Sequence, residues 1–262
     1  MDSTYKQETM KYGKKDAIIA LCVYVVFMIW ASLFFAISQD YVGDVRWMQV
    51  VGMAGAVALT AIVFVVTTVR KQGLPSIGIH KERLLPAICL GLMFAVIPLI
   101  INVAVPAALY EGLELRPIGS SLYLLFYFSI MAAYEDIFFV GFLQTRLYGL
   151  VKTDRAAISL GAVLFSFIHI PVALMSMELL GFELVFYLVG LLFMHQALVL
   201  IFRRHFSIFA VIVVHTIINW SYTSIWLWGG AETNYAFFWA SITGLAFVIA
   251  VNIWDWRIRR RG

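Results

Sequence analysis

The sequence predicts an all-α polytopic membrane protein, a bundle of about eight transmembrane helices. The first observation behind this prediction is composition, because 63% of the 262 residues are apolar and only 13% are charged. A soluble domain needs more polar residues than this to cover its core. The second observation is that the apolar residues gather in stretches of roughly 20, the length of helix that crosses a bilayer. These two features exclude a soluble globular protein and a disordered chain.

Eight apolar stretches fit along the chain without overlap. The segments between them are short and rich in glycine, proline and charged residues, which is typical of loops. The expected spans are residues 17–37, 47–69, 86–108, 121–143, 156–175, 182–202, 206–228 and 235–255. Since no soluble region is large enough to form a nucleic-acid surface, no nucleic-acid partner is expected in spite of the net charge of +4.

The distribution of lysine and arginine predicts the orientation of the bundle. With eight spans, seventeen of the nineteen cations fall in alternate loops or at the two ends of the chain, and only Arg46 and Arg116 lie on the other side. Cationic loops stay in the cytoplasm, so both termini are predicted to be cytoplasmic. The chain then divides into a cytoplasmic N-terminal segment (1–16), a transmembrane domain (17–255) and a basic cytoplasmic tail (256–262).

Ionisable residues inside the predicted spans are few and fall in one region of the chain. Glu135 and Asp136 lie in the fourth span, His169 in the fifth, and His215 with Asn219 in the seventh. Each ionisable group costs about 2.5–3.5 kcal/mol in hydrocarbon, so such residues call for a functional explanation. Measured along each helix, they lie about 12–20 Å from the predicted cytoplasmic end, so they can meet in one layer.

Helical spacing constrains how these residues face one another. His215 and Asn219 are four residues apart and therefore share one face of their helix. Glu135 and Asp136 are adjacent and point about 100° apart, so only one of them is expected to face a given partner directly.

Other polar and aromatic residues of the spans have simpler interpretations. We interpret His195, next to Gln196 in the sixth span, as a hydrogen-bonded packing residue. Phe138 and Phe139 are expected to face lipid or anchor the helix at the interface, as aromatic residues often do.

Residue types alone leave three interpretations of the polar layer open. The carboxylates and imidazoles can be structural contacts between helices, or a proton relay in a transporter. They can also activate water, with a carboxylate as the base and imidazole and amide N–H groups as donors to an oxyanion.

Three segments resemble the motifs of a known family. Residues 134–144, Tyr-Glu-Asp-Ile-Phe-Phe-Val-Gly-Phe-Leu-Gln, resemble the EExxxR motif of the CPBP intramembrane proteases, which include the CAAX prenyl endopeptidases and bacteriocin-processing and immunity proteins. Residues 165–169, Phe-Ser-Phe-Ile-His, are similar to the FxxxH motif, and residues 215–219, His-Thr-Ile-Ile-Asn, to the HxxxN motif. The resemblance covers residues from about 120 to 222.

The resemblance implies an intramembrane endopeptidase of a prokaryotic cell membrane that hydrolyses a peptide bond in a membrane-associated protein or peptide. In this family Glu135 would be the base that activates water, His169 would share that water, and His215 with Asn219 would bind the oxyanion. Members have been described both as metalloproteases and as metal-free enzymes. If a metal is present, zinc is the candidate ion, and Glu135, His169 and His215 are its candidate ligands.

The first motif departs from the family pattern at two positions. Asp136 replaces the second glutamate, and Val140 stands where the arginine is expected, so an ion pair between positions four residues apart is lost. Our hypothesis is that Glu135 still works while Asp136 is a supporting hydrogen-bonding group. A cation such as Arg146 against Asp136 would contradict it.

The same departures leave two further interpretations open. The chain can be a catalytically inactive relative that acts as a bacteriocin immunity factor or membrane scaffold, or a proton-coupled transporter. For the protease, we expect a polar cavity among the fourth to seventh spans that opens toward the cytoplasmic leaflet.

Overall fold

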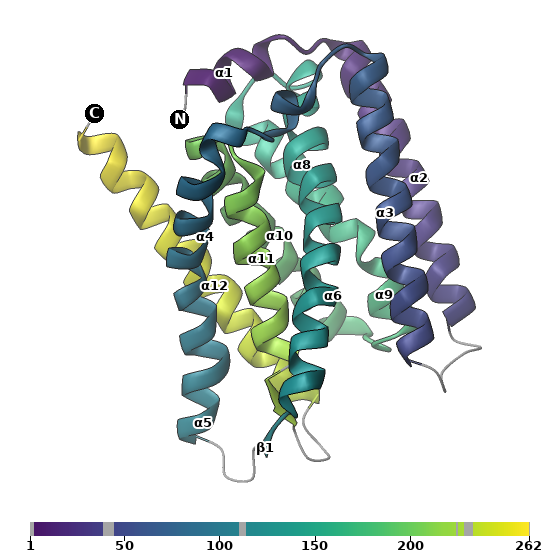
Figure 1. The fold of residues 1–262 in the computed structure, drawn as a ribbon, viewed down its shortest axis with the longest axis vertical. Coiled ribbons are helices and arrows are strands. Elements are labelled where there is room, and N and C mark those ends of the chain that lie inside the picture. Colours follow the sequence, from purple (N-terminus) through teal and green to yellow (C-terminus); the bar gives the residue numbers. More distant parts are fainter. Residues whose placement is uncertain (1–2, 39–44, 110–113, 224, 228–232, 262) are drawn as a thin grey trace.

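The predicted all-α membrane fold is confirmed by the computed structural model, which describes residues 3–38, 45–109, 114–223, 225–227 and 233–261 (Figure 1). The α-helices are α1 (Ser3–Met10), α2 (Lys14–Ser38), α3 (Val45–Val69), α4 (Leu84–Leu99), α5 (Val105–Leu109), α6 (Ile118–Asp136), α7 (Gln144–Arg146), α8 (Asp154–Ile168), α9 (Ile170–Met175), α10 (Gly181–His205), α11 (Ile208–Thr223) and α12 (Thr233–Arg261). Short 3₁₀ or π segments are η2 (Leu74–Ile77), η3 (Lys81–Arg83), η4 (Ile100–Ala104), η5 (Ile137–Leu143) and η6 (Leu147–Gly149). Two-residue strands β1 (Glu114–Leu115) and β2 (Trp226–Leu227) pair antiparallel.

Each predicted apolar stretch contains a helical segment, but the seventh, 206–228, is helical only over Ile208–Thr223 and ends in β2. Residues 224 and 228 of that stretch lie outside the described residues. Among the described residues, six helical segments are long and apolar enough to cross a membrane: Lys14–Ser38, Arg46–Val69, Lys81–Leu109, Ile118–Gly149, Asp154–Met175 and Gly181–His205. The apolar helix Ile208–Ser221 is shorter. The count of eight spans therefore stays a prediction, while the polytopic helical architecture does not depend on it.

Two of these segments change their helical geometry near the polar layer. The segment from α6 continues through the π-helical turn η5 directly after Asp136. Helix α8 ends at Ile168 and α9 begins at Ile170. Pro171 explains this second break, because it lacks the N–H that would continue the helix.

The cationic loops gather at one end of the bundle, which we call the terminal end because α1 and the last turns of α12 lie there (Figure 1). Arg203 near the end of α10 pairs with Asp154 at the start of α8 at 2.7 Å, and Arg204 pairs with Asp255 of α12. The opposite end, which we call the distal end, holds the β1–β2 pair.

Helices α4, α11 and α12 lie in close contact with one another. A Cβ on Gly91 of α4 would lie 2.8 Å from the carbonyl oxygen of Ala210, so α11 can approach only because residue 91 is glycine. Near the distal end, Asn102 donates a hydrogen bond to Ser221 of α11 at 3.0 Å and accepts one from Thr243 of α12. Each of these polar groups is thereby satisfied inside the bundle.

The N-terminal segment folds onto the bundle. Tyr5 of α1 is fully buried, with edge-to-face contacts to Tyr148, Phe202 and Phe206. Helix α1 therefore covers the terminal end, and α12 continues without a break through most of the predicted tail.

Arg146 differs from the prediction that it belongs to a cationic loop, because its side chain is only 1% exposed. Its guanidinium donates to Gln72 Oε1 at 2.7 Å and to Ser76 Oγ at 2.9 Å, and it stacks 4.4 Å from the ring centroid of Tyr12. Since its partners come from the N-terminal segment and from the loop after α3, Arg146 holds the terminal end together.

Replacing Arg146 should therefore destabilise the protein. Arg146→Ala leaves buried acceptors without a donor, at a cost of about 3 kcal/mol. Reversible unfolding in detergent measures the free-energy difference. Arg155→Ala is the matched control, because Arg155 is exposed near the same end of the bundle, and an equal loss in the two variants would contradict this account.

Candidate active site

The polar residues of three helices meet about midway along the segment 118–149. Glu135 Oε2 of α6 lies 3.7 Å from His215 Nε2 of α11 and 4.0 Å from His169 Nε2 at the α8–α9 break. Three residues that are far apart in the sequence, Glu135, His169 and His215, are thus brought together in one layer.

Asp136 holds the other nitrogen of His215. Its Oδ1 lies 3.1 Å from His215 Nδ1, and the aspartate is fully buried. Both neighbouring carboxylates therefore contact one imidazole, which corrects the expectation that only one of them could face the same partner. The expectation fails because the ring presents its two nitrogens in different directions, so one carboxylate reaches each of them.

His169 is oriented by the backbone of its own helix. Its Nδ1 lies 2.8 Å from the carbonyl oxygen of Phe165. A carbonyl only accepts hydrogen bonds, so Nδ1 carries the proton, and in the neutral ring Nε2 is an acceptor directed toward Glu135. The contact with the Phe165 carbonyl oxygen thus sets the tautomer of His169 and the direction of its Nε2.

A cavity of about 480 Å³ begins at this layer. Glu135, His169, His215 and Asn219 all line it, together with many apolar and aromatic side chains of α2, α3, α6 and α10. Asn219 lies one turn after His215 on the same helix, as its spacing predicts, and so belongs to the same cavity wall.

The two departures from the first motif have different surroundings. Val140 is fully buried in apolar packing. Asp136, one turn earlier, is paired with His215, and the hydrogen bonds of Arg146 go to other groups. Arg146 is therefore not the cation against Asp136, but His215 stands there instead, and a protonated His215 ring is a cation of the kind that our hypothesis about Asp136 excluded.

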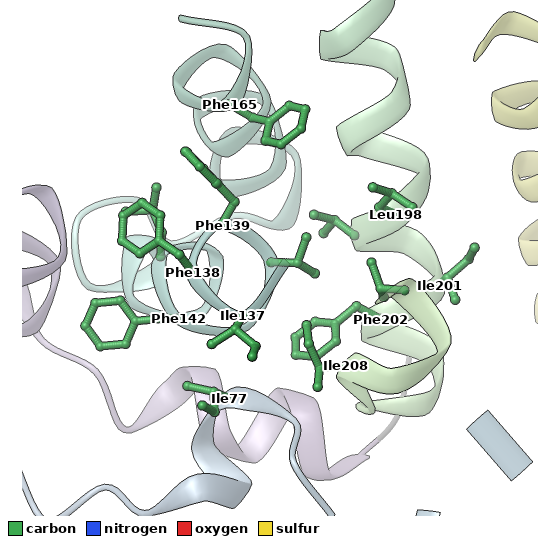
Figure 2. Close-up of a cluster of buried hydrophobic side chains, with 14 of the residues drawn as sticks. Ile77, Ile137, Phe138, Phe139, Phe142, Phe165, Leu198, Ile201, Phe202 and Ile208 are labelled. Carbon is green, nitrogen blue, oxygen red and sulfur yellow. The ribbon is translucent and has the colours of Figure 1, made fainter. Parts of the chain in front are cut away.

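Phe138 and Phe139 are not lipid-facing, as their sequence suggested, but fully buried. With Phe142 and Phe165 they form an aromatic layer within the buried hydrophobic cluster (Figure 2). Because η5 leads from Asp136 toward the terminal end and Phe165 precedes His169 on α8, this layer lies on the terminal side of the polar residues. The ring of Phe165 lies 4.7 Å from that of His169 and 6.3 Å from that of His215, centroid to centroid. The sequence does not reveal this layer, because hydropathy does not distinguish a lipid-facing phenylalanine from a buried one.

His195 lies behind the aromatic layer and outside the cavity wall. Its ring stacks on Phe165 at 4.8 Å and is fully buried. The neighbouring polar side chain is Gln144. A Cβ added to Gly161 would lie 2.1 Å from Gln144 Oε1 and 3.4 Å from His195 Nε2. Gln144 was not predicted, and Gly161, which makes room for it, is the sequence signal that could have indicated it.

The candidate ligands do not form a ready metal site. Within the described ranges, no group of three histidine, cysteine, aspartate or glutamate residues is arranged to hold a metal ion. Glu135 Oε2 is 3.7 and 4.0 Å from the two imidazole nitrogens, whereas two donors of a tetrahedral zinc site, each about 2.0–2.2 Å from the ion, stand about 3.4 Å apart. Zinc would need these side chains to move closer by a few tenths of an ångström, and Glu135, His169 and His215 stay the candidate ligands for such an ion.

Comparison with known protein families finds a match for part of the chain. Residues 117–221 match the sequence model of a family described as Rce1-like, type II CAAX prenyl endopeptidase Rce1-like. The matched segment contains Glu135, His169, His215 and Asn219. No curated protein matches the chain.

The cavity predicts which histidines a reagent can reach. His169 exposes 16% of its side chain, whereas His195 is fully buried. Diethyl pyrocarbonate should therefore modify His169 well before His195 in the folded protein, and mass spectrometry of peptides measures both. Equal rates in the folded protein would contradict the separation of the two rings by Phe165, and unfolded protein supplies the control in which both react.

Proposed function

This chain belongs, over residues 117–221, to the CPBP and CAAX protease family, and on that premise we propose that it is an intramembrane endopeptidase. It hydrolyses a peptide bond in a membrane-associated protein or peptide, in a prokaryotic cell membrane. The observation that carries the proposal is the position of Glu135 Oε2, between two imidazoles at the inner end of a cavity.

Glu135 is the proposed general base. The distance of 4.0 Å between Glu135 Oε2 and His169 Nε2 is too long for a direct hydrogen bond. A water molecule between these two acceptors can donate one hydrogen bond to each of them. As the water attacks the peptide carbonyl, Glu135 takes its proton and later delivers it to the leaving amine. His169 holds the attacking oxygen in place.

His215 and Asn219 are the proposed donors to the oxyanion. A ring that carries protons on both nitrogens donates Nδ1–H to Asp136 and keeps Nε2–H for the negative oxygen that forms on the substrate. Asp136 is thus a positioning residue, because it orients the imidazole without touching substrate. This role gives a physical reason for a carboxylate at position 136 in the absence of the motif's arginine.

The position of the cavity favours a hydrolase over the proton-coupled transporter. A transporter needs a pathway that opens alternately to both sides of the membrane. Here the polar layer is bounded on its terminal side by the closely packed rings of Phe138, Phe139 and Phe165. Hydrolysis needs access from one side only, whereas transport would also require these rings to part.

Removing the proposed base should abolish cleavage. Glu135→Gln keeps the shape of the side chain and should lower the cleavage rate by about 10²–10⁴-fold, the usual contribution of a general base. Mass spectrometry of membrane and secreted peptide termini, from cells that express either form at equal levels, measures it and names the substrate.

Glu114→Gln is the matched control, because Glu114 is exposed at the distal end and away from the polar layer. Identical termini with and without Glu135 would contradict the proposal and leave the inactive immunity factor or scaffold as the better account.

Asn219→Ala should mainly slow the chemical step. Loss of one oxyanion donor lowers kcat by about 10²–10³-fold, and KM changes little because the donor acts in the transition state. Kinetics on the substrate found above, with purified protein of equal thermal stability, measure both constants. Asn252→Ala on α12 is the control, since Asn252 is exposed and bonds only its own helix among the described contacts. A rise in KM with unchanged kcat would show that Asn219 binds the ground state instead.

A further inference from the structure

The cavity occupies one half of the bundle. Its wall comes from the distal half or the middle of every helix that contributes to it, for example Phe34 near the end of α2, Gly52 near the start of α3 and Tyr187 near the start of α10. The cavity therefore extends from the polar layer toward the distal end, away from the chain termini.

The terminal side of the polar layer is closed by side chains. Phe138, Phe139 and Phe165 are fully buried on the terminal side of Glu135 and His169. Leu198 and Ile201 of α10 belong to the same buried cluster (Figure 2). Beyond this layer, α1 covers the terminal end through the buried ring of Tyr5. A substrate that approached from the terminal end would have to displace the best-packed part of the protein.

The other end of the cavity is open. Its wall includes Phe182, Glu183 and Phe186 in the first turns of α10, where Phe182 is 80% and Phe186 43% exposed. The two phenylalanine rings stack on each other at 5.9 Å. The rim therefore combines exposed apolar rings, which lipid can contact, with a carboxylate, which needs water, so it can be reached from both.

Charge relates this opening to the two sides of the membrane. Arg70, Lys71, Lys152, Arg203 and Arg204 all belong to the loops and helix ends of the terminal end, which the positive-inside rule assigns to the cytoplasm. The distal end, where the cavity opens, then faces the extracytoplasmic side. The expected cytoplasmic termini and the expected opening toward the cytoplasmic leaflet are therefore incompatible in this fold.

We propose that the active site takes its substrate from the extracytoplasmic half of the membrane, through the rim formed by Phe182, Glu183 and Phe186. The substrate class is a peptide segment exposed at or anchored in that leaflet, with bulky apolar groups that fit the aromatic wall. The identity of the occupant as a peptide rests on the proposed function, whereas the side of access rests on geometry and charge alone.

Gly190 offers a direct test of access. It lines the cavity about 14 Å along α10 from Gly181, and a Cβ added there meets no atom within 4 Å, so Gly190→Cys places a thiol in open space. The two native cysteines, Cys22 and Cys89, are exposed and are first replaced by alanine. Intact cells are then treated with a charged, membrane-impermeant methanethiosulfonate, and the remaining free thiols are counted by a gel-shift maleimide.

Two matched control variants carry a thiol at positions of known exposure. Lys152→Cys puts an exposed thiol at the terminal end, and Ala197→Cys puts a fully buried one two turns beyond Gly190 on the same helix. We expect Gly190→Cys to react in intact cells, Lys152→Cys to react only after the membrane is permeabilised, and Ala197→Cys to react in neither condition while the protein is folded.

Each other outcome overturns the proposal. Reaction of Lys152→Cys in intact cells reverses the orientation, reaction of Gly190→Cys only after permeabilisation places access on the cytoplasmic side, and no reaction at Gly190 closes the cavity. Glu135→Gln, added to Gly190→Cys, separates this proposal from the proposed function. Labelling of the Gly190→Cys thiol should be the same with and without Glu135→Gln, because the side of access does not depend on the base. If that thiol is labelled in intact cells but the native protein cleaves no peptide, proteolysis is overturned and the side of access stands.

Discussion

The contact between Asp136 and His215 is the interaction on which the arrangement of the site depends. In hydrocarbon there is no water to satisfy a carboxylate or an imidazole, so each group needs a partner inside the protein. The Oδ1–Nδ1 distance of 3.1 Å joins α6 to α11 in the middle of the bundle. This contact fixes the plane of the imidazole, and Nε2 is thereby held within 3.7 Å of Glu135. The geometry of the base and the geometry of the proposed oxyanion donor are therefore set by one contact.

The two halves of the bundle have different roles, because the terminal half holds the site in place and the distal half admits the substrate to it. On the terminal side, Arg146, Tyr5 and the aromatic layer leave little free space, and their packing holds α6 and α8 at fixed positions. On the distal side the same helices part around a cavity of about 480 Å³. Glycines serve both purposes: Gly161 admits the side chain of Gln144 on the packed side, and Gly190 leaves space in the cavity. A rigid half and a hollow half suit a site that must keep its groups in place while admitting a large apolar substrate.

The sequence predicts the helices well because crossing a bilayer demands long apolar runs, a one-dimensional signal. The first predicted span, 17–37, lies within α2 (Lys14–Ser38), and the intramembrane charges identify Glu135, His169 and His215. The direction in which side chains point is less predictable. Phe138 and Phe139 have the composition of lipid-facing residues but are buried, and Arg146 is charged like a loop residue but is enclosed by Gln72, Ser76 and Tyr12. These differences depend on contacts between distant segments, which no local pattern contains.

The change in the first motif illustrates how a buried charge can keep its place when its partner is lost. An arginine at position 140 would pair with an acid at position 136 along a single helix. With Val140 there, the cation that faces Asp136 can come only from another helix, and His215 of α11 supplies it when its ring is protonated. The pairing then couples two helices, and it acts on a residue of the polar layer itself. Loss of the motif's arginine therefore does not leave Asp136 without a partner, because His215, the histidine of the third motif, contacts it from another helix.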